Sequence, residues 1–260
     1  MKTIILAGGW GTRLGQLSNS VPKPMVAIGN KPVLWHIMKI YSHYGFNDFI
    51  IALGVKGDII KNYFYNFESR NNDFTADLST GEIVYHNKHN ESDWKVTLVD
   101  TGLNTMKGGR IKRVEKYLDE DFNMVTYGDG VADINVKKLI ECHKSHGKTV
   151  TITGVHPPAR FGELIEKDGQ VASFEEKSQT SVGLINGGFM VFNKNLLDYL
   201  TEDEECDLER GTFEKLTKEG EVIVYKHIGN WECMDHERDV GHLNHLWNAG
   251  KAFWKVWHYG

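Results

Sequence analysis

Short apolar segments alternate with helical patterns along the chain, and this alternation restricts the possible folds more than any other feature of the sequence. Each apolar segment has the length and content of a strand that is buried on both faces. They cover residues 3–7, 49–53, 95–99, 123–126, 149–153, 188–192 and 222–225. Strands that alternate with helices form a mostly parallel sheet with helices on both sides. The sequence therefore predicts an α/β fold.

The predicted helices lie between these strands. The clearest one follows Pro32, because four apolar residues from Leu34 to Tyr41 fall on one helix face and Gly45 stands where a left-handed residue would end the helix. Further helices are predicted for 58–67, 110–117, 136–146, 209–218 and 238–249. We expect one domain over residues 1–260, with a more irregular C-terminal part from about residue 194.

The composition is that of a globular protein without a strong overall electrostatic field. Hydrophobic residues make up 40% of the 260 positions, which is enough to fill the core of a domain of this size. The 30 Lys and Arg residues are outnumbered by 35 Asp and Glu residues, and the net charge of -5 argues against nucleic acid or an anionic membrane as a partner. An anionic substrate would then need a local site or a bound cation.

Neither a membrane helix nor a secretion signal is expected. No apolar segment approaches the roughly 18 residues that a membrane helix needs, and the apolar start MKTIILAGG is soon broken by glycine. Cys142, Cys206 and Cys233 are far apart and form no CxxC pair, so reduced thiols are expected rather than disulfides or structural zinc. We expect a cytoplasmic protein.

The segment LAGGWGTRL, residues 6–14, stands at the end of the first predicted strand. In a parallel sheet, ligands bind beyond the carboxyl ends of the strands. Glycines there let the backbone approach a phosphate and donate its N–H groups, but the same residues also suit a purely structural turn. Spacing excludes two other phosphate motifs. A dinucleotide GxGxxG motif would need glycine at Leu14, and no P-loop GxxxxGK sequence occurs.

Two cations accompany this loop. Arg13 offers a planar guanidinium that suits phosphate oxygens, and Lys23 lies between Pro22 and Pro24, which restrict the backbone around it. Either side chain alone is more often a surface charge. Together with the glycines they indicate a polyphosphate site.

A second candidate site, TYGDGVAD at residues 126–133, begins where the strand predicted for 123–126 ends. Asp129, flanked by glycines, is a hard carboxylate that suits Mg²⁺, although Asp-Gly is also common in plain tight turns. A magnesium ion usually takes one or two protein carboxylates, and Asp235 in WECMDHERD is the candidate partner. Glu237 and Asp239 in the same segment are better explained as the start of a helix.

In order along the chain, the motifs GGWGTRL, PKPM, GDG, EK and INGGF and a late aspartate resemble those of the sugar-1-phosphate nucleotidylyltransferases. LVDTG, GGRIKRV, PPARFG and the tail GKAFWKVW narrow the resemblance to the cytidylyltransferases of that family, over essentially the whole chain. It implies a Rossmann-like nucleotide-diphospho-sugar transferase fold, dependence on Mg²⁺ and a homo-oligomer, which is a hexamer in the best-known relative. It also implies that CTP reacts with α-D-glucose 1-phosphate to give CDP-glucose and pyrophosphate.

The resemblance also implies a role for each matching residue. Those that would bind the nucleotide are Leu6, Ala7, Gly8, Gly9, Trp10, Gly11, Thr12, Arg13, Lys23, Thr105, Arg110 and Gly128. Arg13 would contact the β- and γ-phosphates and Lys23 the α-phosphate, while Thr105 and Arg110 are the candidates for reading cytosine. Those that would bind the sugar and its phosphate are Glu176, Lys177, Asn186 and Gly187. Asp129 and Asp235 would hold Mg²⁺, and the predicted catalytic residues are Arg13, Lys23 and Asp129.

The implied reaction needs no covalent protein nucleophile, because a phosphate oxygen of the sugar attacks the α-phosphorus in line and pyrophosphate leaves. The protein contributes positioning and charge neutralisation. Two alternatives stay open: a thymidylyl- or uridylyltransferase of similar build, and a non-catalytic protein that binds sugar nucleotides and regulates a partner. The second would be expected to have lost charged site residues, yet they are all present. A CDP-glucose product would point to dideoxysugars of surface polysaccharide such as O-antigen.

Overall fold

A computed structural model describes residues 1–15, 17–157, 163–175 and 183–258. Its centre is a seven-stranded sheet with the strand order β14–β10–β13–β8–β1–β4–β7. The strands are β1 Thr3–Ala7, β4 Asp48–Leu53, β7 Lys95–Asp100, β8 Phe122–Tyr127, β10 Val150–Val155, β13 Ile185–Asn193 and β14 Val222–His227. Every neighbouring pair is parallel except the two that β13 makes with β8 and β10. These are the seven predicted strands, so the α/β prediction is confirmed.

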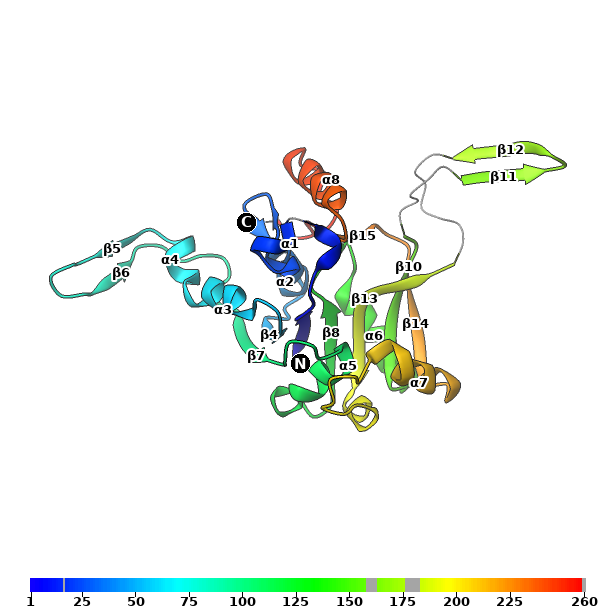
Figure 1. The fold of residues 1–260 in the computed structure, drawn as a ribbon, viewed down its shortest axis with the longest axis horizontal. Coiled ribbons are helices and arrows are strands. Elements are labelled where there is room, and N and C mark those ends of the chain that lie inside the picture. Colours follow the sequence, from blue (N-terminus) through cyan, green and yellow to red (C-terminus); the bar gives the residue numbers. More distant parts are fainter. Residues whose placement is uncertain (16, 158–162, 176–182, 259–260) are drawn as a thin grey trace.

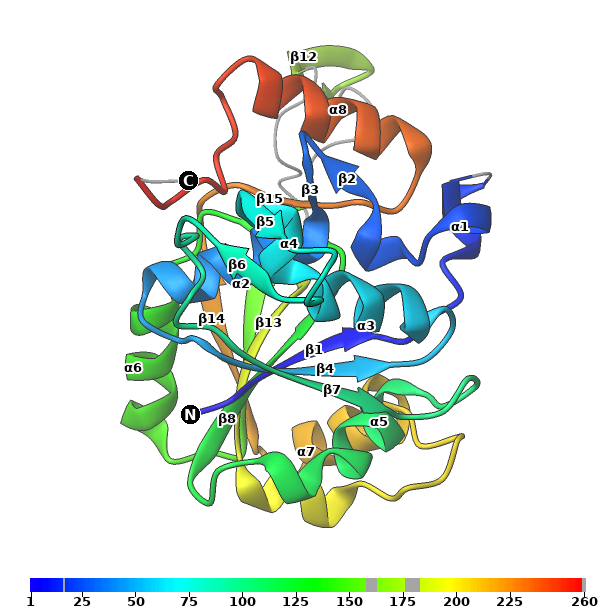
Figure 2. The same cartoon turned by 90° about the vertical axis from the view of Figure 1, so that its left-hand side faces the viewer.

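The two faces of the sheet carry separate hydrophobic cores, because side chains alternate along each strand. On β1, Ile5 and Ala7 belong to one core, while Ile4 and Leu6 belong to the other. The first core is completed by α2 Val33–His43, α3 Gly57–Tyr65 and α6 Val136–His146, and the second by α5 Lys107–Arg113 and α7 Glu214–Lys218. Figure 2 shows helices on both sides of the sheet. Packed side chains thus cover both faces of the inner strands, which leaves the ends of the strands for a ligand.

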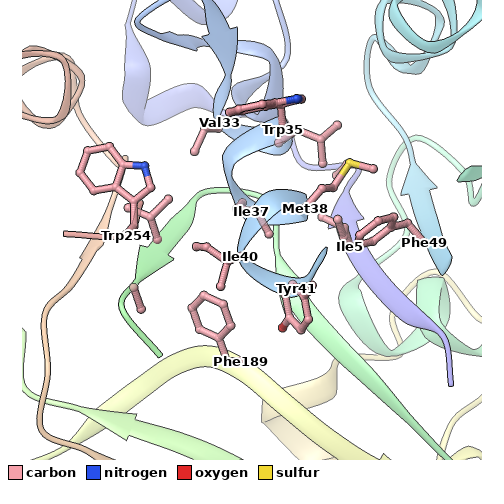
Figure 3. Packing of buried hydrophobic residues seen from close by; sticks show 14 of the residues in the cluster. Ile5, Val33, Trp35, Ile37, Met38, Ile40, Tyr41, Phe49, Phe189 and Trp254 are labelled. Carbon is pink, nitrogen blue, oxygen red and sulfur yellow. The ribbon is translucent and has the colours of Figure 1, made fainter. Parts of the chain in front are cut away.

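Helix α2 is enclosed by the rest of the protein. From Val33 to Tyr41 every residue is buried. Ile5 of β1 packs on one side of the helix and Trp254 of the C-terminal segment on the other (Figure 3). Beyond the helix the chain turns at Gly45, whose φ of 89° is left-handed, as the sequence predicts.

The other predicted helices agree with the structure to different degrees. Helix α6 has the predicted bounds, and α8 Glu237–Asn248 lies within one residue of the prediction at each end. The helix predicted for 58–67 is divided, because α3 ends at Tyr65 and a separate α4 Phe67–Asn71 follows. The helix predicted for 110–117 begins earlier, as α5, and is continued by a short 3-10 turn, Glu115–Tyr117.

The helix predicted for 209–218 is wrong in its first half. Arg210 and Gly211 have non-helical backbone angles, and the φ of Gly211 is 88°, a value that favours glycine. Only α7 is regular helix in this region. The interruption turns the chain just after Glu209, and this affects the substrate site described below.

Four two-stranded units lie outside the central sheet in the described part of the chain, and the sequence analysis predicts none of them. They are β2 Ala27–Ile28 with β3 Lys31–Pro32, β5 Phe74–Ala76 with β6 Ile83–Tyr85, β9 Gly130–Ala132 with β15 Trp231–Cys233, and β11 Glu163–Lys167 with β12 Gln170–Glu175. The β5–β6 and β11–β12 hairpins project from opposite ends of the molecule (Figure 1). Most of these strands have two or three residues, too few for a recognisable alternation.

Short helical turns connect several of these elements. They are α1 Leu17–Ser20 and the 3-10 turns Thr12–Leu14, Lys23–Met25 and Lys194–Tyr199. None of the described helices is long and apolar enough to cross a membrane.

Candidate active site

A cavity of about 610 Å³ lies at the carboxyl ends of β1 and β8, where ligands bind in sheets of this kind. Its volume falls within the range of small-molecule sites. The structure brings together around it every predicted site residue that it describes: Leu6, Ala7, Gly8, Gly9, Trp10, Gly11, Thr12, Arg13, Lys23, Thr105, Arg110, Gly128, Asp129, Asn186, Gly187 and Asp235. Glu176 and Lys177 lie outside the described residues.

The glycine-rich loop after β1 forms one wall of the cavity. Gly11 has a left-handed backbone with a φ of 67°, which glycine adopts without steric cost. A Cβ atom on Gly8 would lie 2.2 Å from the Arg110 guanidinium, so this position has no room for a side chain. The carbonyl of Gly8 accepts a hydrogen bond from Val55 N (3.3 Å), which ties the loop to the segment after β4. The glycines therefore allow both the turn and the close packing beneath it.

Arg110 reaches the base of this loop from α5 and is almost fully buried, with 4% of its surface exposed. Its guanidinium donates to five oxygen atoms: Leu53 O, Thr101 Oγ1 and Gly102 O at 2.8 Å, Gly8 O at 2.9 Å and Leu103 O at 3.3 Å. Burial lowers its pKa from the usual value. The planar fork of arginine can satisfy several acceptors at once, so this side chain joins two loops and the end of β4 at the floor of the cavity.

The short β9–β15 ladder sets the positions of two acidic side chains. Gly130 pairs with Cys233 in this ladder, and Met234 N donates to Asp129 O (2.9 Å). Asp129 comes directly before β9, and Asp235 follows β15 after one intervening residue. The antiparallel pairing therefore brings together two carboxylates that are far apart in the sequence.

Lys23 lies between these two carboxylates. Its Nζ is 2.6 Å from Asp129 Oδ2 and 2.5 Å from Asp235 Oδ1. Arg13 completes the cluster, with Nη1 2.9 Å from Asp235 Oδ2. The guanidinium side chain of Arg13 is well exposed, whereas Lys23 is mostly buried. Two cations and two carboxylates thus form one ionic cluster at the cavity wall.

The pKa values in this cluster follow from its charges. Burial alone would lower the pKa of Lys23, but the Asp129 and Asp235 carboxylates outweigh burial and raise it. Burial alone would raise the pKa of Asp235, but its hydrogen bond and charge contact with Lys23 lower it. Lys23 and Asp235 are therefore both charged near neutral pH. Burial and the nearby carboxylates raise the pKa of Cys233 to about 12, so its thiol stays protonated and donates to Asp235 Oδ2 at 3.7 Å.

Other predicted site residues already form hydrogen bonds within the protein. Thr105 is buried, and its Oγ1 accepts a hydrogen bond from Arg113 Nη1 (2.8 Å). Asn186 Nδ2 donates to the Tyr127 hydroxyl (2.9 Å), and the carbonyl of Gly187 accepts from Trp231 Nε1 (2.8 Å).

Trp10 differs from these residues because 61% of its surface is exposed at the edge of the cavity. Its ring is therefore open to contact with a bound molecule or a neighbouring subunit.

Sequence analysis missed ten residues that line the cavity. They are Pro24, Leu103, Asn104, Met106, Lys107, Tyr127, Gly130, Asp207, Trp231 and Cys233. Several of these residues stand next to recognised motifs in the sequence, so their place at the cavity could have been predicted from those motifs. Asp207 had no such signal, because the acidic segment around it is most simply explained as solvated. Tertiary hydrogen bonds from Met106 N to Glu204 O (2.7 Å) and from Gly109 N to Cys206 O (2.9 Å) bring that segment to the site.

Comparison with known proteins identifies the family. A family model described as nucleotidyl transferase matches residues 2–255. The chain belongs to the nucleotidyl transferase family. Among the relatives of this nucleotidyl transferase are the glucose-1-phosphate cytidylyltransferases of Salmonella typhimurium (strain LT2) and Salmonella typhi, each 47% identical over 258 residues. The match covers 99% of this chain and 100% of each relative, and it confirms the resemblance seen in the motifs.

A solved structure agrees with this assignment. HddC from Yersinia pseudotuberculosis, crystallised as a complex with GMP-PN, is similar to the nucleotidyl transferase with a TM-score of 0.68 and 26% sequence identity. The similarity covers 95% of this chain and 99% of HddC. The fold built on this central sheet is therefore that of a nucleotidyl transferase.

Proposed function

We propose that this nucleotidyl transferase moves a cytidylyl group from CTP to α-D-glucose 1-phosphate and releases CDP-glucose and pyrophosphate. The observation that carries the proposal is the 47% identity to two glucose-1-phosphate cytidylyltransferases over the full length of both chains. The cluster of Arg13, Lys23, Asp129 and Asp235 at the cavity wall supports it, because these charges suit a triphosphate and a metal ion.

The two carboxylates fit a divalent cation. Asp129 and Asp235 both contact the single Nζ atom of Lys23, so both are within reach of one cation. Hard carboxylate oxygens suit Mg²⁺, which takes its remaining ligands from phosphate and water. In agreement with such an open site, the described residues contain no group of three or more His, Cys, Asp or Glu side chains that could enclose a metal. Bound there, Mg²⁺ would neutralise charge on the triphosphate.

The cationic side chains then have separate tasks. Arg13 grips the β- and γ-phosphates, because its exposed guanidinium can turn from Asp235 to phosphate oxygens. Lys23 is held close to the reacting α-phosphate and neutralises the charge that develops as the new bond forms. The glycine loop from Leu6 to Thr12 and Gly128 bring backbone N–H groups close to the nucleotide. The phosphate oxygen of the sugar attacks the α-phosphorus in line, so the enzyme catalyses the reaction by positioning the two substrates and neutralising their charge.

The remaining predicted contacts are part of the same proposal. Thr105 and Arg110 lie on the nucleotide side, where they shape the surroundings of cytosine. Asn186 and Gly187 contact the glucose phosphate, together with Glu176 and Lys177 from outside the described residues.

We also propose that the enzyme is a homo-oligomer, with the hexamer of the best-known relative as the expected state. The β5–β6 hairpin supports this proposal, since it projects from the body of the molecule and exposes apolar side chains (Figure 1). Phe74, Leu78, Ile83, Val84 and Tyr85 are all exposed on it. An isolated two-stranded hairpin is marginally stable in water, and apolar surface of this kind usually meets another protein.

A parallel assay of nucleotides tests the substrate assignment. Purified enzyme, glucose 1-phosphate and Mg²⁺ are combined with CTP, UTP or dTTP, and pyrophosphate release is measured. We expect CTP to give a kcat/KM at least about a hundredfold above that of UTP and dTTP, because discrimination by hydrogen bonds to a base is strong. Equal rates with dTTP or UTP would instead favour a thymidylyl- or uridylyltransferase, and no turnover with any nucleotide would favour a non-catalytic binder.

A further inference from the structure

A second cavity of about 530 Å³ adjoins the active-site cavity next to α5. Lys107, Tyr127, Asn186 and Asp207 line both cavities, whereas Glu209 lines only the second. The two phosphate-binding cations line only the first. The second cavity therefore extends the substrate site on the side where the sugar is expected.

Hydrogen bonds link the polar side chains of this second cavity. The Tyr127 hydroxyl donates to Glu209 Oε1 and accepts from Asn186 Nδ2 (2.9 Å). Lys107 Nζ lies 2.6 Å from the same Glu209 Oε1 and 5.2 Å from the centre of the Tyr127 ring. Glu209 is thus oriented by a phenol and an ammonium, and Asn186 connects this group to the predicted sugar contacts.

The interrupted helix directs Glu209 into the cavity. Asp207 Oδ1 accepts hydrogen bonds from Glu209 N (2.8 Å) and Arg210 N (3.3 Å), and the chain leaves the helical path at Arg210 and Gly211. A helix that continued without a break from residue 208 into α7 would fix how this segment lies against the cavity. With the break at Arg210 and Gly211, the segment lies so that Glu209 contacts Tyr127 and Lys107 on other elements.

One acceptor of this group is unused. Glu209 Oε2 is buried and has no hydrogen-bond partner among the described residues. A buried acceptor without a donor is unfavourable. Because the final torsion of a glutamate is loosely restrained, a small rotation can turn this oxygen toward the cavity. A ligand hydroxyl is a donor of suitable size for it.

The charges of the second cavity indicate a neutral ligand group with many hydroxyls. The ammonium of Lys107 is paired with Glu209, so the pair has no net charge to attract phosphate. It still offers spare N–H donors and carboxylate acceptors, which a sugar hydroxyl can use in both directions. Tyr127 and Met106 add apolar surface beside them. This combination differs from the cationic cluster that faces the triphosphate.

We propose that Glu209, oriented by Lys107 and Tyr127, binds hydroxyl groups of the hexose and determines which hexose 1-phosphate the enzyme accepts. The proposal rests on the proposed function, since it places the sugar of the same substrate. A site built to hydrogen-bond a hydroxyl group rejects substrates that lack it or present it at the wrong angle. Glu209 is therefore a specificity-determining residue.

Replacement of Glu209 with glutamine tests this assignment. Glu209→Gln keeps the size of the side chain and removes its charge and one acceptor. We expect KM for glucose 1-phosphate to rise about tenfold or more, with KM for CTP unchanged, because one charged hydrogen bond to the sugar is lost. We also expect the preference for glucose 1-phosphate over galactose, mannose and the monodeoxyglucose 1-phosphates to decrease. A variant with unchanged sugar KM and unchanged preference would overturn the proposal.

A matched control and the wild-type enzyme separate the possible failures. Glu205→Gln makes the same chemical change on an exposed side chain that lines neither cavity, and it should leave every constant unchanged. If the wild-type enzyme makes no CDP-glucose, the proposed function fails. If it does and Glu209→Gln keeps its selectivity, only the role of Glu209 fails.

A second variant covers the case in which Glu209→Gln does not fold. Tyr127→Phe keeps the ring and removes the hydroxyl that orients Glu209. It should raise the sugar KM by a smaller factor, about threefold, and weaken the same sugar preference, because Tyr127 acts on selectivity through Glu209. A purely structural role would lower the melting temperature without a change in the relative kcat/KM for the different sugars, and that result would contradict the proposal.

Discussion

Lys23 and Arg13 balance the charges of Asp129 and Asp235 within the protein itself. Lys23 contacts both carboxylates, and Arg13 contacts Asp235. Binding of a metal–triphosphate would exchange these partners, since the carboxylates would face the metal and the cations would face phosphate. The cluster therefore has little net charge before and after that exchange, which limits the cost of burying it.

Asp129→Asn tests the proposed metal contact directly. The amide has nearly the same shape but no charge, so we expect metal-dependent turnover to fall at least about a hundredfold while the fold is retained. Steady-state kinetics at several Mg²⁺ concentrations and circular dichroism measure these two effects. Asp198→Asn, an exposed position away from the cavity, is the matched control. Turnover like that of the wild type in Asp129→Asn would refute the role of this residue.

The free energy of unfolding should depend on pH through the buried ring of His36. The ring is fully buried, its Nε2 donates to Ile28 O (2.9 Å), and its Nδ1 accepts from Trp254 Nε1 (3.3 Å). These partners assign a neutral ring, and burial lowers the pKa of His36 to about 4. Its contribution is fully present above pH 6.5, the unfolded-state pKa. It is lost as the pH falls toward 4, because only the unfolded chain binds the proton.

The expected loss is about 3 kcal/mol across that pH range, at about 1.4 kcal/mol for each unit of pKa difference. Urea unfolding of the wild type and of His36→Gln at pH 7 and pH 4.5 measures it. The variant is less stable at pH 7, but its free energy of unfolding should decrease less on acidification. An equal decrease in both proteins would show that His36 does not titrate as proposed.

Among the elements, α5 and the loops beneath the nucleotide site depend on one another through Arg110. Its guanidinium binds Gly8 O, the carbonyl of Leu53 at the end of β4, and atoms of the loop that precedes α5. An ammonium has three donors and no planar fork, so lysine cannot satisfy all of these acceptors. The positions of the two loops should therefore loosen when Arg110 is replaced.

Arg110→Lys should increase amide hydrogen exchange at residues 8–11 and 54–57 in the absence of nucleotide, by about tenfold, because at least one buried hydrogen bond is lost. Exchange followed by mass spectrometry localises the effect. Arg238→Lys changes an exposed arginine on α8 and should leave the exchange unchanged. Unaltered exchange in Arg110→Lys would mean that the loops are held by other contacts.

The elements also show why some features were predictable. The five inner strands of the sheet are mostly buried and the two edge strands, β7 and β14, are partly buried, and the continuous apolar segments identify all seven without further information. The prediction for 209–218 is wrong because the composition suits a helix, whereas the turn that Asp207 caps is broken at Arg210 and at Gly211, which has a positive φ. The β5–β6 hairpin has strands of three residues with exposed side chains, so it shows no buried pattern.

The candidate site was predictable where it lies on motifs and unpredictable where it depends on tertiary register. The glycine loop and Asp129 stand directly after strands, so their place at the strand ends follows from topology. Asp235 and Asp129 share Lys23 as a partner, and this arrangement depends on the β9–β15 pairing, which short strands do not reveal. Glu209 contacts Tyr127, which lies 82 positions earlier in the sequence, and no local pattern indicates that contact.

At the scale of the whole molecule, the two hairpins project in opposite directions from the body (Figure 1). Polar contacts fix the base of the β5–β6 hairpin, and the ion pair between Lys39 and Glu91 is buried on both sides. Lys39 Nζ lies 3.2 Å from Glu91 Oε1, and His89 Nε2 lies 2.9 Å from Glu68 Oε1. Buried ion pairs restrict geometry more than they add stability. The hairpin is thus held in a defined direction.

Loss of apolar surface on this hairpin should weaken the proposed assembly. Ile83 and Val84 are 52% and 50% exposed, so their replacement by Thr removes little of the subunit's own core and keeps the strand propensity. We expect Ile83→Thr/Val84→Thr to shift the mass distribution in analytical ultracentrifugation toward smaller species at micromolar concentration. At an interface, loss of two buried apolar contacts weakens association about tenfold or more.

Glu82→Gln alters a polar side chain of the same hairpin and serves as its control. Circular dichroism and CTP binding should be the same in all three proteins, since the hairpin lies away from the cavity. A monomeric wild-type enzyme would contradict the homo-oligomer itself. An oligomer whose mass is the same in wild type and Ile83→Thr/Val84→Thr would place the interface elsewhere, because a contact that includes this apolar strand cannot tolerate both substitutions without loss of affinity.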